Sequence, residues 1–152
     1  MPVANCALLV KPILELQGVD IKSDEYLLNV VSLVKDRCTL LNDFYTQSVY
    51  FFQAPQAIDV ESVKPKWSVD KADFFTELIG RYEQLTEWNL EALETCFKAL
   101  ATEKNTKVGD VQFIYRIMLV GGKFGPGVFQ ISEMIGKQDS LERIQRLMGL
   151  LG

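Results

Sequence analysis

The 152-residue sequence contains no histidine. It therefore lacks the side chain that most often acts as a general base or binds zinc. Carboxylate or lysine chemistry would still be possible, but no phosphate-binding loop of the Gly-x4-Gly-Lys-Ser/Thr type occurs. The acidic stretch 68–103 has glutamates at a spacing typical of one solvated helix face: Glu83, Glu87, Glu91 and Glu94. We expect no catalytic residue and no metal site in this chain.

Cysteines and long apolar runs are also scarce. Cys6, Cys38 and Cys96 are an odd number and lie far apart, which argues against a disulfide framework or a zinc site and favours reduced thiols. No apolar run approaches the roughly 18 residues that cross a bilayer. The first residues lack the basic region of a secretory signal. We expect a cytoplasmic protein without a membrane partner.

The net charge of −4 is unevenly distributed. Residues 1–67 carry six basic and eight acidic groups, and residues 68–103 carry three and eight. Residues 104–152 carry seven basic and four acidic groups, a net charge of +3. A phosphate backbone needs only a local basic face, because charges beyond about 10 Å are largely screened. The last third of the chain is therefore the candidate for contact with a nucleic acid.

Helical periodicity of apolar residues dominates the sequence and predicts an all-α, multihelical fold in two small subdomains. In the first half, it predicts three helices. One covers Val3–Leu16, a second begins after a cap at Ser23, and a third covers residues 39–50. Residues 55–68 contain Pro55 and Pro65 and are the best linker. We place the boundary near Lys66, which gives subdomains 1–66 and 67–152.

The second half predicts five helices with recognisable ends. A cap at Ser68 or Asp70 opens the first helix, and a cap at Thr86 opens the second. The third covers Val108–Val120 and stops at Gly121, a common C-terminal signal. Pro126 precedes the fourth helix, and the pair Asp139 and Glu142, spaced as in a capping box, opens the last.

The turn between the third and fourth of these helices combines groups that could bind an unpaired nucleobase. Arg116 has five donors in a rigid fork. Val128 and Phe129 would offer an apolar shelf, since stacking on an aromatic contributes about 1–3 kcal/mol per base. The amides of Gly127 and Val128 begin a helix and lack intrahelical partners, and Pro126 stiffens the turn. Alternatively, Phe129 is a plain core residue and the glycines are only turn residues.

The same residues carry a resemblance to a known family. The chain has Arg116, Gly121, and then Pro126-Gly-Val-Phe129, followed by Ile135-Gly-Lys137 and Leu141-Glu-Arg-Ile144. This order and spacing resembles the C-terminal anticodon-binding region of bacterial glutamyl-tRNA synthetases. The resemblance implies that five residues contact the first two anticodon nucleotides: Arg116, Pro126, Gly127, Val128 and Phe129. The family commonly has Thr or Ser before the proline. Here Gly125 stands there, so Lys123 or a backbone amide would have to replace the hydroxyl.

A second match lies in the first half of the chain. Residues 34–43 resemble the family's Glu-Arg-x-x-Thr-Leu segment, and Tyr50-Phe-Phe52 resembles the Tyr-Phe-Phe that follows it. The resemblance implies that Arg37 contacts the third anticodon nucleotide, which separates glutamate from glutamine codons. Alternatively, Arg37 caps a helix or pairs with Asp36 or Asp43.

The class I synthetase signatures, a His-Ile-Gly-His-type motif and a Lys-Met-Ser-Lys-Ser-type loop, are absent. The resemblance therefore implies an inactive fragment of a glutamate–tRNA ligase, without its catalytic domain or a cofactor of its own. ATP and magnesium would serve the full-length enzyme. We expect a monomer whose partner is the anticodon loop of tRNA-Glu rather than DNA. The alternative is a helical protein-interaction module anchored by exposed aromatics, namely Trp67, Trp88 and Phe129.

Overall fold

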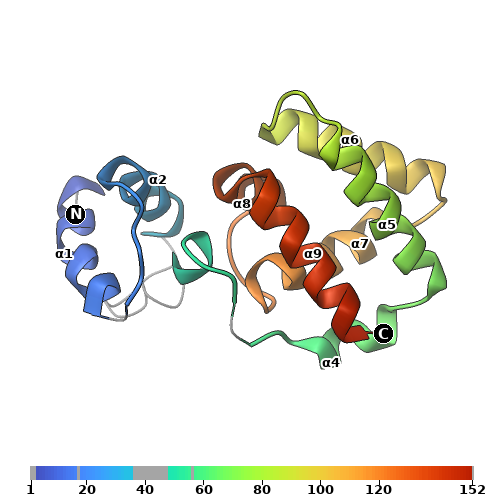
Figure 1. Cartoon of the computed structure of the whole chain (residues 1–152), viewed down its shortest axis with the longest axis horizontal. Coiled ribbons are helices and arrows are strands. Elements are labelled where there is room, and N and C mark those ends of the chain that lie inside the picture. Colours follow the sequence, from blue (N-terminus) through green and yellow to red (C-terminus); the bar gives the residue numbers. More distant parts are fainter. Residues whose placement is uncertain (1–2, 17, 36–47, 56, 152) are drawn as a thin grey trace. The chain divides into compact units, whose positions relative to one another are not determined.

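A computed structural model describes residues 3–16, 18–35, 48–55 and 57–151. Helices are the regular elements of these ranges, and no strand occurs in them, which confirms the predicted all-α class. The chain forms two compact units, Met1–Pro55 and Gln56–Gly152 (Figure 1). The boundary that we placed near Lys66 falls within the second unit.

The described residues of the first unit form two packed helices, α1 (Val3–Leu16) and α2 (Asp24–Val34), and a short 3-10 helix, η2 (Val49–Phe51). The predicted cap at Ser23 is confirmed, because its hydroxyl accepts the N–H of Tyr26 at 3.0 Å. The hydroxyl of Tyr26 donates to the carbonyl of Phe51 at 2.5 Å and ties α2 to η2. Most of the helix predicted over 39–50 lies outside the described residues.

Residues 57–151 of the second unit form seven elements and hold the candidate site. They are α4 (Val60–Val63), η3 (Lys64–Lys66), α5 (Val69–Glu83), α6 (Leu90–Glu103), α7 (Val108–Val120), α8 (Val128–Ile135) and α9 (Lys137–Leu151). α5 packs against α6 and α9, and α7 packs against α8 and α9 (Figure 1). α8 also contacts α6, so the short helix α8 is enclosed by its three neighbours.

Aromatic side chains fill the core between these helices. The ring of Phe97 lies at the centre of the cluster, with centroid distances of 5.2 Å to Phe74, 5.4 Å to Tyr115 and 5.3 Å to Phe129. Such pairs contribute roughly 0.5–1.5 kcal/mol each beyond the burial of their area. Because the four residues come from α5, α6, α7 and α8, this cluster fixes the helices relative to one another.

The helix starts of this unit show where local signals succeed and fail. Ser68 caps α5 as predicted. Thr86 was the wrong cap for α6. Asn89 has the extended backbone that a cap needs, and its side chain accepts the N–H of Ala92 at 2.8 Å. The capping box at Asp139 was also wrong, because α9 begins at Lys137 directly after Gly136.

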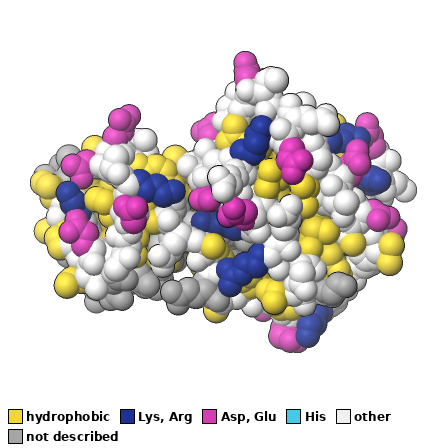
Figure 2. All heavy atoms as spheres, in the orientation of Figure 1, with side chains coloured by type: hydrophobic (Ala, Val, Ile, Leu, Met, Phe, Trp, Pro, Cys, Tyr) yellow, Lys and Arg dark blue, Asp and Glu magenta, His cyan; other side chains and the backbone are white. Residues whose placement is uncertain are grey.

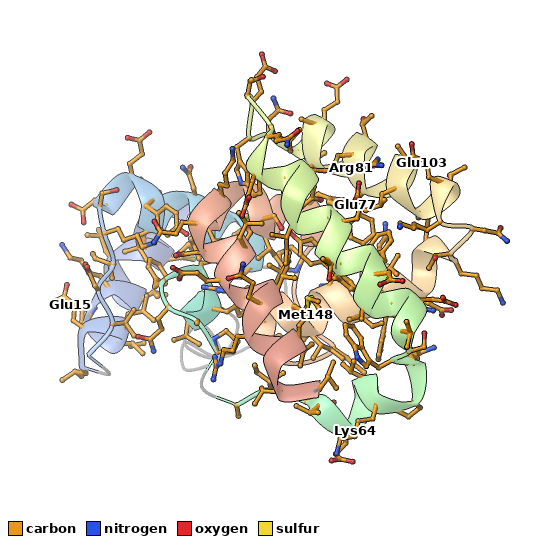
Figure 3. The ribbon with its side chains drawn as sticks, turned by 45° about the vertical axis from the view of Figure 1, so that its right-hand side comes forward. Glu15, Lys64, Glu77, Arg81, Glu103 and Met148 are labelled. Atoms are coloured by element: carbon orange, nitrogen blue, oxygen red, sulfur yellow. The ribbon has the colours of Figure 1, made fainter. Side chains whose placement is uncertain are left out.

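The acidic stretch does not form the single solvated face that we expected. Glu83 ends α5, Glu87 lies in the following connection, and Glu91 and Glu94 lie on α6. A different cluster joins the two helices at the surface: Arg81 of α5 pairs with Glu77 at 3.2 Å and with Glu103 of α6 at 2.5 Å (Figure 3). Both carboxylates raise the pKa of Arg81, and the hydrogen bond to Glu103 has the larger effect. None of the described helices has the length and apolar character to cross a membrane.

Candidate nucleic-acid interface

The C-terminal end of α7 leads directly into residues 121–127, which we call the glycine turn. Gly121 ends the helix with a left-handed backbone (φ 86°), as predicted. Nη1 of Arg143, on α9, donates to the carbonyl of Leu119 at 2.7 Å. The backbone N–H of Asp59 donates to the carbonyl of Gly121 at 2.9 Å. Two segments distant in sequence thus satisfy carbonyls that a helix end leaves without intrahelical partners.

Arg116 holds the other half of the glycine turn. Its Nη1 atom donates to three consecutive carbonyls, those of Phe124 at 3.0 Å, Gly125 at 3.0 Å and Pro126 at 2.7 Å. The side chain is half-buried. We expected this guanidinium to serve nucleotide acceptors; in the structure this nitrogen binds the protein's own turn. Arg116 is therefore a positioning residue that fixes the shape of the turn.

The expectation that Phe129 and Val128 form an exposed shelf is wrong. Phe129 is only 7% exposed, and its ring centroid lies 5.3 Å from that of Phe97 and 6.5 Å from that of Tyr115. Val128 is 5% exposed. The first turn of α8 is buried because α6 and α7 both pack against this helix. The structure thus places Phe129 in the core, the alternative that the sequence left open.

The amide of Gly127 is also engaged within the protein. It donates to Oε1 of Gln130 at 3.1 Å, which is one half of a capping box at the start of α8. Pro126 is buried behind it, whereas Gly127 itself is exposed. Of the predicted wedge, only the backbone of Gly127 therefore lies at the accessible surface.

The exposed side chains of the glycine turn are those of Lys123 and Phe124. Lys123 is exposed, and Phe124 is 39% exposed. A Cβ atom at Gly122 would lie 2.7 Å from Cε1 of Phe124, so the ring lies against the backbone of Gly122. Gly125 has a φ of 102°, which side-chain-bearing residues rarely adopt. Glycine at this position therefore fits the turn as it is folded here.

Beneath the turn, Tyr115 connects α7 to α8. Its hydroxyl shares a hydrogen bond with Oγ of Ser132 at 2.6 Å, and both residues are fully buried. Burial raises the pKa of Tyr115, and the hydrogen bond to Ser132 opposes this shift. The hydroxyl consequently stays protonated at neutral pH and acts as a structural link.

A cavity of about 350 Å³ opens beside Arg116. Its wall contains residues of α6, α7 and the start of α8: Glu94, Gly109, Gln112, Phe113, Arg116, Gly127, Val128 and Phe129. The volume is within the roughly 300–1,000 Å³ typical of small-ligand pockets. We call it the α6–α8 pocket. Four predicted site residues, Arg116, Gly127, Val128 and Phe129, thus meet at one pocket, although two of them are largely buried.

Part of the positive charge of the last third is engaged within the fold. Lys137 donates to the carbonyls of Glu83 and Leu85 at the end of α5, at 3.1 and 2.7 Å. Together with Arg116 and Arg143, it makes three cations that bind backbone carbonyls. On the side drawn in Figure 2, basic and acidic side chains are interspersed. Arg116 lines the pocket, and Lys98 brings a second positive charge there by pairing with Glu94 of the lining at 2.7 Å.

Two further predictions concern residues away from the turn. Arg37 lies outside the described residues. The aromatic anchors of the alternative reading are not exposed: Nε1 of Trp88 donates to the carbonyl of Ser132 at 2.8 Å, and Trp67 stacks on Phe75 with ring centroids 6.1 Å apart. Both indoles are half-buried parts of the fold.

The sequence reasoning missed Glu94, Gln112 and Phe124. Gln112 precedes Arg116 by four residues on a predicted helix, so helical spacing alone could have placed it on the same face. Glu94 lies on another helix, and only the packing of α6 brings it to the pocket. Phe124 looked like an ordinary turn residue. No group of three or more His, Cys, Asp or Glu suited to a metal ion was found among the described residues.

The fold and the site together define a helical domain with a firmly held turn beside a ligand-sized pocket. A family model described as an anticodon binding domain matches residues 5–148. The chain belongs to this family, which confirms the resemblance found in its sequence.

Relatives of known activity extend the comparison. The glutamate–tRNA ligase of Porphyromonas gingivalis is 33% identical over 149 residues, which are 98% of this chain and 29% of that protein. That of Chloroherpeton thalassium is also 33% identical, over 95% of this chain and 30% of its own length. The crystal structure of a glutamate–tRNA ligase from Elizabethkingia meningosepticum, in complex with its amino acid, superposes with a TM-score of 0.89 at 31% identity. This match covers all of this chain and 30% of the solved chain. The chain thus spans about 30% of the length of these relatives.

Proposed function

We propose that this chain is the anticodon-binding part of a glutamate–tRNA ligase and that it binds the anticodon loop of a tRNA for glutamate. The family match over residues 5–148 supports the anticodon-binding role. The glutamate–tRNA ligases that cover 98% and 95% of the chain support the choice of tRNA. The observation that carries the proposal is the α6–α8 pocket beside a turn whose carbonyls are fixed by Arg116.

The geometry supports recognition of unpaired bases. Proteins read single-stranded RNA by taking splayed bases into pockets and onto aromatic or guanidinium planes. The α6–α8 pocket has an apolar part, Phe113, Val128 and Phe129, and a polar part that includes Gln112. In this proposal, Phe129 and Val128 support the pocket from within the core rather than from an exposed shelf. Because Arg116 holds the turn before RNA arrives, little conformational entropy is lost on binding.

The exposed residues of the glycine turn have a separate role in this proposal. Lys123 would attract the phosphate backbone as a point charge. Gly125 lacks the hydroxyl usual in the family, and the exposed Lys123, two residues earlier, would supply a donor in its place. Arg37 remains our candidate for the third anticodon nucleotide, on the resemblance alone.

Binding of an anticodon stem-loop tests the proposal. We expect Arg116→Ala to weaken the binding of a tRNA-Glu anticodon stem-loop by about 1–3 kcal/mol, because the turn loses its shape and the pocket loses a donor. Arg81→Ala is the matched control: it changes the net charge equally but lies on α5, outside the pocket lining. Affinity for RNA should also fall steeply as salt rises, unlike that of a mainly apolar protein contact. Equal affinities of wild type and Arg116→Ala at constant salt would defeat the proposed role.

The wider activity belongs to the longer ligase. There we propose a cytoplasmic monomer that joins glutamate to tRNA with ATP and magnesium, as the resemblance implies. The share of the relatives that this chain spans, about 30%, leaves that chemistry to the rest of the protein. Full-length protein from the natural gene should charge tRNA-Glu in an ATP-dependent assay, and absence of charging would contradict this part of the proposal.

A further inference from the structure

Two charged residues where α8 meets α9 have the wrong sign for the helices that carry them. Glu133 is in the last turn of α8, and Lys137 is the first residue of α9. A helix has a partial negative charge at its C-terminal end and a partial positive charge at its start. Each side chain is therefore placed unfavourably for its own helix. The contacts that explain this placement lie on neighbouring helices.

Each of these charges meets a helix end of opposite partial charge. Oε2 of Glu133 accepts the N–H of Leu90, the first residue of α6, at 2.6 Å. Nζ of Lys137 donates to the carbonyls of Glu83 and Leu85, at and just beyond the end of α5, at 3.1 and 2.7 Å. Helix ends lack such partners within their own helix. The junction of α8 and α9 thus holds the end of α5 and the start of α6.

Trp88, in the connection between α5 and α6, is attached to the same junction. Its Nε1 atom donates to the carbonyl of Ser132 at 2.8 Å, and Nζ of Lys137 lies 5.9 Å from the centroid of its ring. Ser132 is fully buried in α8, so this contact joins the connection to the core. The connection is therefore held by α8 and α9 together.

These contacts bear on the part of α6 that lines the α6–α8 pocket. Glu94, the α6 residue of the lining, lies between two attachments of α6 to α8. One is the hydrogen bond between Leu90 and Glu133, one helical turn before it. The other is the contact between the rings of Phe97 and Phe129, whose centroids are 5.3 Å apart. Loss of the first attachment would let α6 tilt about the second and change the width of the pocket.

We propose that Glu133 and Lys137 are positioning residues, which fix α6 in the wall of the α6–α8 pocket without contacting RNA themselves. This inference rests on the proposed function for the ligand of the pocket. Lys137 belongs to the residues that give positions 104–152 a net charge of +3, and charge alone would assign it to a phosphate. Its two hydrogen bonds to carbonyls assign it to the fold instead.

The first experiment measures the affinity of methionine variants for a tRNA-Glu anticodon stem-loop. Glu133→Met and Lys137→Met should each weaken binding about fivefold, because the α6 wall is displaced. Glu133→Gln and Lys137→Arg keep an acceptor and a donor, so they should bind within about twofold of wild type. Asn89→Ala is the matched control, since it removes the cap on the N–H of Ala92 but leaves the link from α6 to α8. It should bind like wild type. Wild-type affinity in both methionine variants would overturn the proposal.

The salt dependence of the same affinities separates a positioning lysine from one that contacts phosphate. A lysine that neutralises one phosphate of single-stranded RNA contributes about 0.7 to the slope of log affinity against log salt. Lys137→Met should keep the wild-type slope. Lys123→Met removes the same charge at the residue that we assign to the phosphate backbone, and it should lower the slope by about this amount. A lower slope in Lys137→Met would show a phosphate contact and overturn the positioning role.

A measurement without RNA separates this inference from the proposed function. The backbone amide signal of Glu94 is followed by NMR in wild type, Lys137→Met and Lys137→Arg. We expect Lys137→Met to shift this signal and Lys137→Arg to leave it in place. If the signal shifts as expected but the stem-loop does not bind wild type, the proposed function fails and the positioning role stands. A signal that stays in place in Lys137→Met overturns the positioning role, and stem-loop binding by wild type would then leave the proposed function standing. Loss of the folded spectrum in Lys137→Met would mean that this lysine supports the whole unit rather than the pocket, which also overturns the inference.

Discussion

The end of α7 and the glycine turn that follows it are held by the same chemistry but lie in different surroundings. At the end of α7, Arg143 is 3% exposed and donates to the carbonyl of Leu119. In the turn, Arg116 is half-buried and donates to three carbonyls, of which that of Phe124 belongs to an exposed residue. A carbonyl sealed from water depends on its one donor, whereas a surface carbonyl can exchange that donor for water. We therefore expect the buried arginine to matter more for the stability of the domain, and the half-buried one for the shape of the glycine turn.

Two phenylalanines repeat this contrast. Phe129 is 7% exposed and packs on Phe97 and Tyr115, whereas Phe124 is 39% exposed and lies against Gly122. From the sequence alone, we assigned Phe129 to the binding site and gave Phe124 no role. Accessibility, not residue type, decides which aromatic ring can meet a nucleobase.

The largest expected effect comes from breaking the buried member of the phenylalanine pair. Phe129→Ala should lower the free energy of unfolding by about 3–5 kcal/mol, because it leaves a cavity among packed aromatic rings. Phe124→Ala should cost about 1 kcal/mol or less. Urea unfolding followed by tryptophan fluorescence measures both, since Trp67 and Trp88 are the chain's two tryptophans and lie in the second unit. Similar losses for the two variants would contradict the contrast.

Substitution of the two arginines should also lower the free energy of unfolding more at the buried residue, but with a smaller difference than for the two phenylalanines. Arg143→Met should destabilise the second unit by about 3 kcal/mol, because a buried carbonyl at a helix end loses its charged donor. Arg116→Met should cost about 1 kcal/mol, since water can reach the turn carbonyls. The same urea titration, combined with stem-loop binding, separates the two roles. A larger stability loss in Arg116→Met than in Arg143→Met would show that the turn, rather than the end of α7, supports the fold.

Local signals predicted those elements whose determinants are close in sequence. The bounds of Val3–Leu16 and Val108–Val120 and the caps at Ser23, Ser68 and Gly121 follow from spacing and single-residue preferences. Thr86 failed as a cap because Asn89, three residues later, has a better acceptor in the required extended backbone. Competition between neighbouring cap residues cannot be resolved without knowing where the helix packs.

The sequence predicted where the candidate site lies, but not which groups its cations bind or which residues complete its pocket. Arg116 and the Pro126–Phe129 wedge do meet at one pocket. Counting charges could not show that Arg116, Lys137 and Arg143 bind backbone carbonyls, because the carbonyls come from distant helix ends and from the turn itself. Nor could it show Glu94, which only the packing of α6 brings to the pocket. Both the carbonyl partners of these cations and the position of Glu94 depend on how distant segments pack together.

A smaller effect concerns the buried link below the turn. Tyr115→Phe should cost about 1–2 kcal/mol, because the buried hydroxyl of Ser132 loses its partner. The double variant with Ser132→Ala should recover part of this loss, since both polar groups are then removed. A double variant as unstable as the sum of the single variants would mean that the two hydroxyls do not depend on each other.

Tyr115 should also make the free energy of unfolding depend on pH in the alkaline range. Burial raises the pKa of Tyr115 in the folded state, while the unfolded chain ionises near the ordinary value of 10.0. Stability from this group is therefore complete below pH 10.0 and is lost as the pH rises above it. Tyr115→Phe should flatten the alkaline fall in the free energy of unfolding. Tyr82, whose pKa is also raised by burial, should preserve part of the fall.

The smallest effect should appear at acid pH, where Asp59 joins α4 to the glycine turn. The Ser62 hydroxyl, which donates to its carboxylate at 2.6 Å, lowers the pKa of Asp59; the N–H of Ser62 and nearby Lys123 act in the same direction. Because the folded-state pKa is below the ordinary value of 3.8, the stabilisation is present above pH 3.8 and is lost as the pH falls through the folded-state pKa. Asp59→Asn keeps an acceptor for the N–H of Ser62 but has no charge, so its stability should depend less on pH in this range. Parallel urea titrations from neutral pH to below 3.8 measure the difference, and identical acid profiles for wild type and Asp59→Asn would show that this carboxylate does not help to hold the turn in place.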